Sequence, residues 1–243
     1  MSRIYIGVGH GGTDSGAVYK NFIEKDINLI IAKECKRVLQ ENGQEVYISR
    51  ESDITSSIYK KTTECNNLKC DYAIDIHTNA GGGKGFEAYH TILGGKGKFL
   101  CENIEKEVLK IGQNSRGCKT KVINGMDYFG FIRQTKCPSA ILECAFLDNE
   151  QDRRMIDSIE KQKAFGVAYA KGILKTLNVK INEFEKIDST FKVKIEKNVA
   201  ILKNVDVVDT ITGGIYTITE VKDGWGKLKS GIGWICLDNV TRL

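Results

Sequence analysis

Two kinds of hydrophobic pattern alternate along the first part of the chain. Short apolar runs, such as residues 3–8 and 72–76, are typical of strands buried in a sheet. Between these runs, apolar residues recur at helical spacing, most clearly from Ile23 to Leu39, and an Asn-Gly pair then ends the predicted helix. Strands that alternate with helices predict an α/β fold, with an open, largely parallel sheet flanked by helices.

The remaining elements continue this alternation. The sequence predicts further strands at 45–49, 85–90 and 139–143, and further helices at 53–68, 96–111 and 149–175. Asp53 or Thr55 is expected to open the helix at 53–68. Residues 112–137 contain glycine and show no clear period, so an irregular segment is predicted there.

The pattern changes after residue 175. Residues 177–189 are polar and loosely patterned, as in a linker. From residue 190 onward, short alternating segments rich in Val, Ile and Thr are punctuated by glycine turns, which predicts a small all-β barrel. We therefore expect a first domain at 1–176, a linker at 177–189 and a second domain at 190–243.

Composition and charge narrow the class of protein. The 243 residues carry a formal net charge of +5, and the lysines of the last segment alternate with apolar residues, which indicates solvated strand faces rather than a nucleic-acid-binding surface. No apolar run approaches the roughly 18 residues of a membrane helix, so no membrane insertion is expected. The N-terminus shows no signal peptide, so we expect a cytoplasmic protein that reaches a cell wall only after something else releases it.

The eight cysteines do not follow the pattern of a disulfide framework. Seven of them lie between Cys35 and Cys144, and the Cys-x-x-Cys pair of a zinc knuckle is absent from the sequence. Cys35, Cys101 and Cys144 fall within apolar segments, where a small buried thiol packs well. We expect free thiols in a reducing compartment.

Candidate chemistry comes from a few histidines and glutamates. His10, Glu24 and His77 form the kind of set that holds zinc while leaving a fourth position open to water. Glu143, within an apolar run, can handle the proton of that water. His10, His77 and Glu143 each fall at or just past the end of a predicted strand, where ligands collect in parallel α/β folds. A metal-dependent hydrolase is therefore the leading interpretation.

Each of these residues also has a structural interpretation. Glu24 can be an exposed charge that the dipole of its helix favours, and His77 can be a core histidine. His90 is the preferred structural histidine, because it lies on a predicted strand. Glu143 is harder to explain by packing, since a carboxylate at the end of an apolar strand is costly to bury. For Cys144, the apolar flanking residues favour packing over a role as a thiol nucleophile.

Five segments, taken in order, carry a family resemblance. They are VGHGGTDSGA at 8–17, EKDINL at 24–29, SR at 49–50, DIHTNA at 75–80 and CPSAILECAFLDN at 137–149. These segments resemble the zinc-dependent N-acetylmuramoyl-L-alanine amidases of the amidase-3 type. The resemblance implies an open α/β sheet, Zn2+ ligands at His10, Glu24 and His77, and a catalytic glutamate at Glu143. It also implies bacterial peptidoglycan as the partner, cut at the amide between the lactyl group of muramic acid and L-alanine.

Two departures from this family pattern are visible. Gly7-Val8-Gly9 stands where many relatives carry Asp-Pro-Gly, and an arginine often found ahead of the third strand is replaced around Lys60 and Lys61. Neither change touches a proposed ligand. We therefore expect both to affect loop shape or substrate fit rather than metal binding.

The last segment is similar to bacterial SH3-like domains, through residues 223–228 and 233–240. In such domains the fold often binds cell-wall peptides, which would tether the enzyme and raise the local substrate concentration. Trp225 and Trp234 can equally be core aromatics, so binding is assigned to the domain and to no single residue.

We interpret the chain as a peptidoglycan hydrolase, with a zinc amidase domain followed by an SH3-like wall-binding domain. The lack of a signal peptide favours a phage or prophage endolysin that is held in the cytoplasm until a membrane lesion releases it. The alternatives are a host autolysin, a zinc peptidase that cuts the stem peptide, and a non-catalytic wall-binding protein whose metal site has decayed.

Overall fold

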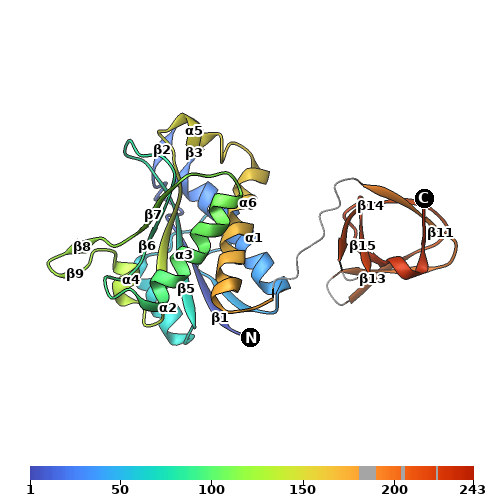
Figure 1. Ribbon diagram of the computed structural model, residues 1–243, viewed down its shortest axis with the longest axis horizontal. Helices are drawn as coiled ribbons and strands as arrows, with labels where there is room; N and C mark the ends of the chain where they lie inside the picture. The colour runs from blue at the N-terminus through green and yellow to red at the C-terminus, as the bar shows by residue number, and fades with distance from the viewer. Residues whose placement is uncertain (181–189, 204–205, 223) are drawn as a thin grey trace. The chain divides into compact units, whose positions relative to one another are not determined.

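The computed structural model describes residues 1–180, 190–203, 206–222 and 224–243. The chain divides into two compact units, Met1–Ile181 and Asn182–Leu243 (Figure 1). The predicted linker at 177–189 extends beyond the described residues, which stop at 180 and resume at 190. Each unit is considered by itself below.

The first unit is built on a mixed sheet that is largely parallel, as predicted. In the described residues its strands are ordered β4 (Glu45–Ile48), β1 (Arg3–Val8), β5 (Tyr72–Asn79), β10 (Ser139–Phe146), β6 (Phe86–Tyr89) and β7 (Ser115–Lys119). Neighbouring strands pair in parallel except β10 and β6, which are antiparallel. A short hairpin, β2 (Val18–Tyr19) and β3 (Phe22–Ile23), leads into the first helix.

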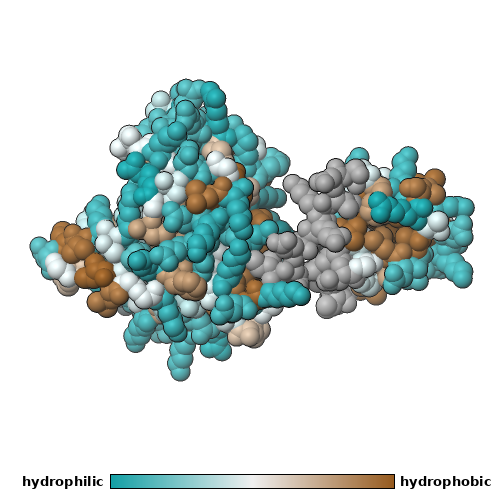
Figure 2. Space-filling model, viewed as in Figure 1, coloured by the Kyte–Doolittle hydropathy of each residue, from teal (hydrophilic) through white to brown (hydrophobic). Residues whose placement is uncertain are grey.

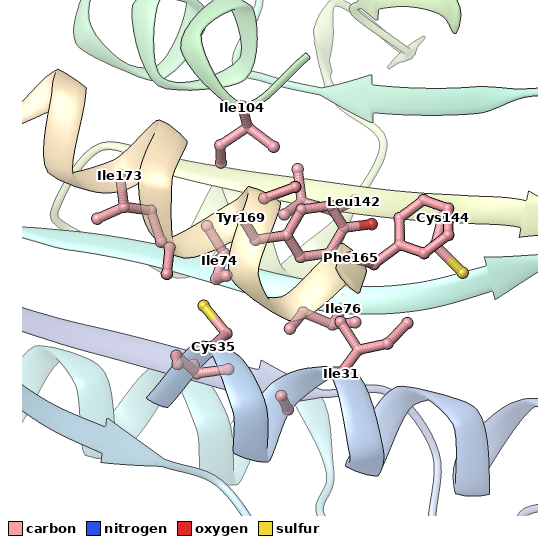
Figure 3. Packing of buried hydrophobic residues seen from close by; sticks show 14 of the residues in the cluster. Ile31, Cys35, Ile74, Ile76, Ile104, Leu142, Cys144, Phe165, Tyr169 and Ile173 are labelled. Carbon is pink, nitrogen blue, oxygen red and sulfur yellow. The ribbon is translucent and has the colours of Figure 1, made fainter. Parts of the chain in front are cut away.

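Helices flank this sheet on both faces, which confirms the predicted α/β class of the first unit. They are α1 (Glu24–Glu41), α2 (Ile58–Asn67), α3 (Gly95–Lys110), α4 (Gly130–Gln134), α5 (Glu150–Arg153) and α6 (Ile159–Thr176). The helices α1, α3 and α6 pack together, and their apolar side chains form the main core with one face of the sheet (Figure 3). The helices α2 and α4 cover the other face.

Strand alternation explains how one sequence serves both faces. In β1, Ile4, Ile6 and Val8 belong to the main core, whereas Tyr5 belongs to a smaller cluster that also contains Phe131 of α4. Successive side chains of a strand point to opposite faces, so a strand buried on both sides is apolar throughout. The predicted packing role of Cys35, Cys101 and Cys144 is confirmed, because all three are buried in the main core.

The segment at 112–137 was wrongly predicted to be irregular. It contains β7, the hairpin β8 (Val122–Ile123) and β9 (Met126–Asp127), and then α4. The strand β7 lies at the edge of the sheet and its side chains are not fully buried, so it lacks the apolar period of a core strand. The hairpin β8–β9 exposes the apolar residues Val122, Ile123 and Met126. Figure 2 shows apolar side chains gathered on one projecting part of the surface.

The start of α2 also differs from the prediction. The helix begins at Ile58, and its N-cap is Ser57, whose hydroxyl accepts a hydrogen bond from the backbone of Lys60. Asp53 does not cap it, because its carboxylate binds the backbone N–H of Gly12 at 2.7 Å and the ammonium of Lys25 at 2.6 Å. Asp53 therefore holds the glycine-rich loop after β1.

The second unit is all-β, as predicted. Its described strands form an antiparallel sheet in the order β13 (Asp206–Ile211), β12 (Val199–Lys203), β16 (Trp234–Cys236), β15 (Trp225–Leu228), β14 (Gly214–Lys222), β11 (Phe191–Ile195) and β17 (Thr241–Arg242), with a 3-10 turn at Leu237–Asn239. Its core contains Val193, Ile201 and Ile235. Trp225 and Trp234 are partly buried and lie outside that core cluster. No helix in the described parts of the chain is long and apolar enough to cross a membrane.

Candidate metal centre

Three predicted ligands meet at the carboxyl edge of the large sheet. The carboxylate oxygen Oε1 of Glu24 lies 3.2 Å from Nε2 of His10 and 3.0 Å from Nδ1 of His77. All three donor atoms lie within 4.8 Å of one another, and this is the one such group of His, Cys, Asp or Glu among the described residues. Two imidazole nitrogens and one carboxylate oxygen are a donor set that suits zinc and leaves a coordination position for water.

The topology explains this convergence. The strands β1 and β5 are parallel neighbours, so the ends that carry His10 and His77 reach the same edge of the sheet. Glu24 is the first residue of α1, and the hairpin β2–β3 returns the chain to this edge before the helix begins. Its side chain is only 6% exposed, which contradicts the interpretation of Glu24 as a surface charge.

The loop that carries His10 is fixed by residues outside the ligand set. Arg50 donates from Nη2 to the carbonyl oxygens of Gly9 at 3.1 Å and Lys25 at 2.7 Å, which links the loop to α1. The hydroxyl of Ser49 accepts a hydrogen bond from the backbone N–H of Val8 at 2.9 Å. The Ser-Arg segment noted in the sequence therefore supports the loop rather than contacting the metal position.

Close backbone approach explains two of the glycines. A Cβ atom at Gly16 would lie 2.6 Å from Oε2 of Glu24 and 2.6 Å from Cδ2 of His10, and a Cβ at Gly9 would lie 2.6 Å from the His77 ring. His10 itself has a positive φ of 59°, a conformation that costs energy for a residue with a side chain. Strain of this kind is concentrated at functional sites.

Each imidazole is held by a second carboxylate on its other nitrogen. Nδ1 of His10 lies 2.8 Å from Oδ2 of Asp14, and Nε2 of His77 lies 3.4 Å from Oδ2 of Asp75. The Glu24 carboxylate also accepts hydrogen bonds from the backbone N–H groups of Ala17 at 2.8 Å and Thr78 at 3.0 Å. Partners of this kind orient metal ligands.

The electrostatics of the site favour a cation. Burial alone would raise the pKa of Glu24, but hydrogen bonds from His10 and His77 hold that pKa well below its usual range. Burial lowers the pKa of His77, yet the Asp75 carboxylate and the hydrogen bond to Glu24 raise it to about 10. The surrounding carboxylates thus stabilise positive charge at the point where the donor atoms meet, which fits the binding of a divalent ion.

Glu143 lies on β10 directly beside His77 on β5. Burial raises the pKa of Glu143 to about 7; the positive charge of His77 opposes this rise, and the negative charges of Glu24 and Glu87 add to it. The residue lines a cavity of about 410 Å³ together with His10 and His77. A carboxyl group with a pKa near neutrality is suited to accept and return a proton.

The predicted ends of two strands differ from those in the structure. The strands β5 and β10 continue to Asn79 and Phe146, so His77 and Glu143 lie within strands rather than past their ends. His90 lies outside the ligand group, is buried, and has Nδ1 2.8 Å from the carbonyl oxygen of Thr91, in agreement with the structural role predicted for it.

Sequence reasoning missed Asp14, Asp75 and Lys61 as parts of the site. Asp75 precedes His77 by two residues on one strand, and this spacing puts both side chains on the same face, a signal that was available. Lys61 carries no such signal, because α2 must pack on the sheet before Lys61 reaches Asp75.

Comparisons with known proteins cover the first unit. A family model described as N-acetylmuramoyl-L-alanine amidase matches residues 4–175. The chain is 32% identical over 186 residues to N-acetylmuramoyl-L-alanine amidase CwlM of Bacillus licheniformis, spanning 75% of this chain and 71% of that protein. It is 33% identical over 192 residues to the endolysin of Bacillus phage SPP1, spanning 74% of this chain and 68% of that protein.

The fold also matches solved structures. The catalytic domain of CwlV, an N-acetylmuramoyl-L-alanine amidase from Bacillus (Paenibacillus) polymyxa var. colistinus, superposes with a TM-score of 0.67 and 28% identity. That match covers 74% of this chain and 100% of the CwlV domain.

Proposed function

Since this chain belongs to the N-acetylmuramoyl-L-alanine amidase family, we propose that it is a zinc-dependent enzyme whose metal is held by His10, Glu24 and His77. Membership of this family identifies the reaction of the chain as hydrolysis of the bond between N-acetylmuramic acid and L-alanine in peptidoglycan. One observation carries the proposal. A single Glu24 oxygen faces both imidazoles at about hydrogen-bond distance, beside a cavity that Glu143 also lines.

Glu143 is the residue that moves protons in this proposal. Zinc, when bound, would supply a Lewis acid that polarises the scissile carbonyl and lowers the pKa of a water, so that this water loses a proton readily and becomes nucleophilic. Glu143 accepts a proton from the attacking water and then donates it to the nitrogen of L-alanine as the amide bond breaks. Its pKa of about 7 allows both directions of transfer near neutral pH.

The residues that line the cavity suggest how the substrate is bound. The cavity is lined by the polar residues Thr55, Ser56 and Ser57 and by the aromatic residues Phe129 and Phe131. The Ser56 hydroxyl is buried and has no hydrogen-bond partner among the described residues, and we propose that it turns toward the cavity to bind a polar group of the substrate. The Phe129 side chain offers an apolar surface to the methyl groups of the lactyl and alanyl moieties.

The bond that is cut tests the reaction. Digestion of purified walls by the zinc-loaded protein is expected to release new L-alanine N-termini, which labelling and mass analysis identify. New D-amino-acid N-termini would instead support the stem-peptide peptidase. No cleavage by a folded, zinc-loaded protein would support the non-catalytic wall-binding alternative.

Substitutions separate metal binding from catalysis. We expect Glu143→Gln to keep its zinc and to lose about 10²- to 10⁴-fold in rate, the usual contribution of a general acid or base. His77→Asn is expected to lose zinc, whereas His90→Asn, at the histidine outside the ligand group, is expected to keep it. Full activity in Glu143→Gln would contradict the catalytic assignment.

The second unit is proposed to be an SH3-like wall-binding domain. The proposed division is a catalytic domain at 1–176, a linker at 177–189 and a binding domain at 190–243; the compact antiparallel sheet of the second unit supports it. A chain ending at residue 180 is expected to cleave small soluble wall fragments as well as the full chain does. It should sediment less with intact walls when both chains carry Glu143→Gln, and equal sedimentation would contradict the binding role.

The biological role proposed is that of a phage or prophage endolysin, with a host autolysin as the alternative. Similarity to the endolysin of Bacillus phage SPP1 supports the first role, and similarity to CwlM of Bacillus licheniformis supports the second. Expression inside a susceptible bacterium distinguishes them. An endolysin held in the cytoplasm is expected to lyse the cell only after the membrane is permeabilised, whereas lysis without permeabilisation would favour an exported autolysin.

A further inference from the structure

Behind the proposed ligand His77, the Asp75 side chain of β5 contacts Lys61 of α2 and lies against Gly7 of β1. Lys61 of α2 places its Nζ 2.8 Å and 3.1 Å from the two carboxylate oxygens of Asp75 on β5. Both side chains are almost fully buried, with 3% and 2% exposed. A buried ion pair is weak evidence for stability, because desolvation of the two charges offsets their attraction. Its position beside the metal centre therefore calls for a chemical role.

The Asp75 carboxylate reaches the His77 ring on the side away from Glu24. Oδ2 of Asp75 lies 3.4 Å from Nε2 of His77, while Nδ1 of the same ring lies 3.0 Å from Glu24. The ring is thus held between two carboxylates, one at each nitrogen. A proton on Nε2 leaves Nδ1 unprotonated, which is the form of imidazole that binds a metal.

Gly7 provides the space for this carboxylate. Gly7 on β1 is the register partner of Asp75, and a Cβ atom at Gly7 would lie 2.4 Å from Oδ1 and 2.9 Å from Cγ of Asp75. The carboxylate therefore occupies the space that a side chain at position 7 would need. Any larger residue at Gly7 would displace Asp75 from both Lys61 and His77.

The same geometry links the two departures from the family pattern that the sequence shows. Gly7 and Lys61 belong to the two segments that depart from the family pattern, and both were expected to affect only loops or substrate fit. In the structure they converge on Asp75, which contacts a proposed ligand. The departures therefore form one coupled arrangement next to the metal centre.

We propose that Asp75 is the positioning residue of His77, with Lys61 as its buried counter-ion and Gly7 as the space it requires. Asp75 accepts the Nε2 hydrogen of His77 and keeps Nδ1 directed at the metal. Lys61 fixes the carboxylate in the orientation that makes this contact. The inference rests on the proposed zinc site, and it assigns to this chain a supporting set that none of the comparisons describes.

Zinc affinity, measured by competition with a chromophoric chelator, tests the inference without using activity. Asp75→Asn alone leaves Lys61 as an unpaired buried charge and can unfold the protein, so the main variant is the double substitution Lys61→Met with Asp75→Asn. We expect this variant to fold, as judged by far-ultraviolet circular dichroism, and to bind zinc about 10- to 100-fold more weakly than the parent, the usual effect of losing such a partner. Glu45→Gln, which removes an exposed carboxylate that pairs with Arg3, is the matched control and should leave zinc affinity unchanged.

The outcomes separate this inference from the proposed function. A folded Lys61→Met, Asp75→Asn variant with parental zinc affinity would overturn the positioning role and leave the ion pair a structural feature. A parent protein that binds no zinc at one ion per chain would refute the zinc proposal itself. Variants that weaken binding while the parent binds zinc tightly support both.

A relocation of the carboxylate provides a second, independent readout. Gly7→Asp with Asp75→Ser keeps one buried carboxylate beside Lys61 and is expected to bind zinc more tightly than the Lys61→Met, Asp75→Asn variant, because the side chain at position 7 enters the space vacated by Asp75. The d–d absorption of the cobalt-substituted protein should shift in Lys61→Met, Asp75→Asn and return toward that of the parent in Gly7→Asp, Asp75→Ser. A Gly7→Asp, Asp75→Ser variant that folds but binds zinc no better than Lys61→Met, Asp75→Asn would contradict a role for a carboxylate at this point.

Discussion

Replacement of Gly16 by alanine is expected to weaken the proposed metal centre as well as the fold. The added methyl would lie 2.6 Å from Oε2 of Glu24 and 2.6 Å from Cδ2 of His10. Carbon atoms pack at about 3.5–4.0 Å, so one or both ligands must move by roughly 1 Å. Displacements of about 1 Å at a reacting site cost about 100-fold in rate. We expect Gly16→Ala to lose 10- to 100-fold in zinc affinity, as when a ligand loses its support, and about 100-fold in amidase activity.

Gly43→Ala is the matched control. Gly16 and Gly43 have similar positive φ values, 64° and 74°, but no atom lies within 4 Å of the position of a Cβ at Gly43. Both substitutions carry the same backbone cost of about 1–2 kcal/mol for a left-handed residue. Equal losses of zinc affinity in the two variants would refute the reasoning, because backbone strain rather than contact with the ligands would then explain the effect.

The stability assay must measure unfolding of the first unit alone, and the two units differ in their spectroscopic signals. The two tryptophans, Trp225 and Trp234, both lie in the second unit, whereas α1 to α6 all lie in the first. Helical circular dichroism therefore follows unfolding of the first unit, which contains the proposed metal centre, and tryptophan fluorescence follows unfolding of the second unit. We expect both glycine variants to lower the midpoint of the helical transition by about 2–4 °C per kcal/mol and to leave the fluorescence transition in place.

Further predictions concern stability. Burial raises the pKa of Glu107, but hydrogen bonds from Lys110 and Lys175 lower that pKa below its ordinary value. The ionised Glu107 therefore stabilises the fold above about pH 4.3, and this contribution is lost as the pH falls through the depressed pKa. Glu107→Gln should remove this part of the loss of stability at acid pH, as measured by urea unfolding at a series of pH values. Gly172→Ala should lower the unfolding free energy by about 1–3 kcal/mol despite the better helix propensity of alanine, since its Cβ would lie 2.4 Å from Cα of Ile104, and an increase in stability would contradict close packing of α6 on α3. Removal of zinc by a chelator should lower the helical transition midpoint reversibly, and an unchanged midpoint would argue against metal binding in the folded unit.

The parts of the fold with strong periodicity were predictable from the sequence. The helix α1 shows a stripe of buried residues, Ile27, Ile31 and Cys35 among them, and its predicted bounds differ from the structure by two residues or fewer. The strand β7 was missed because an edge strand buries too little to need alternating apolar residues. The start of α2 was predicted too early, because Ser57 caps the helix while Asp53 binds the loop after β1.

The arrangement of the proposed ligands was predictable from the sequence only for those that lie at the ends of parallel strands. His10 and His77 follow from parallel strand ends, whereas Glu24 by itself resembles a surface charge, and its role came from the family resemblance. The pair of Lys61 and Asp75 depends on how α2 packs against β5. Contacts of that kind arise from tertiary packing and leave no periodic signal along the chain.

The position of β10 next to β5 has a consequence for biosynthesis. His10, Glu24 and His77 all belong to the N-terminal stretch that ends with β5, while Glu143 is added to the sheet by a strand made much later. Because domains emerge from the ribosome N-terminus first, the nascent chain holds every proposed ligand before it holds its general base. A ribosome-stalled chain that stops before β10 carries all three proposed ligands but lacks the central strand and the helix α6 on which the sheet and α1 pack, so the proposed site is expected to form, and to bind metal, only after the whole first unit has been made.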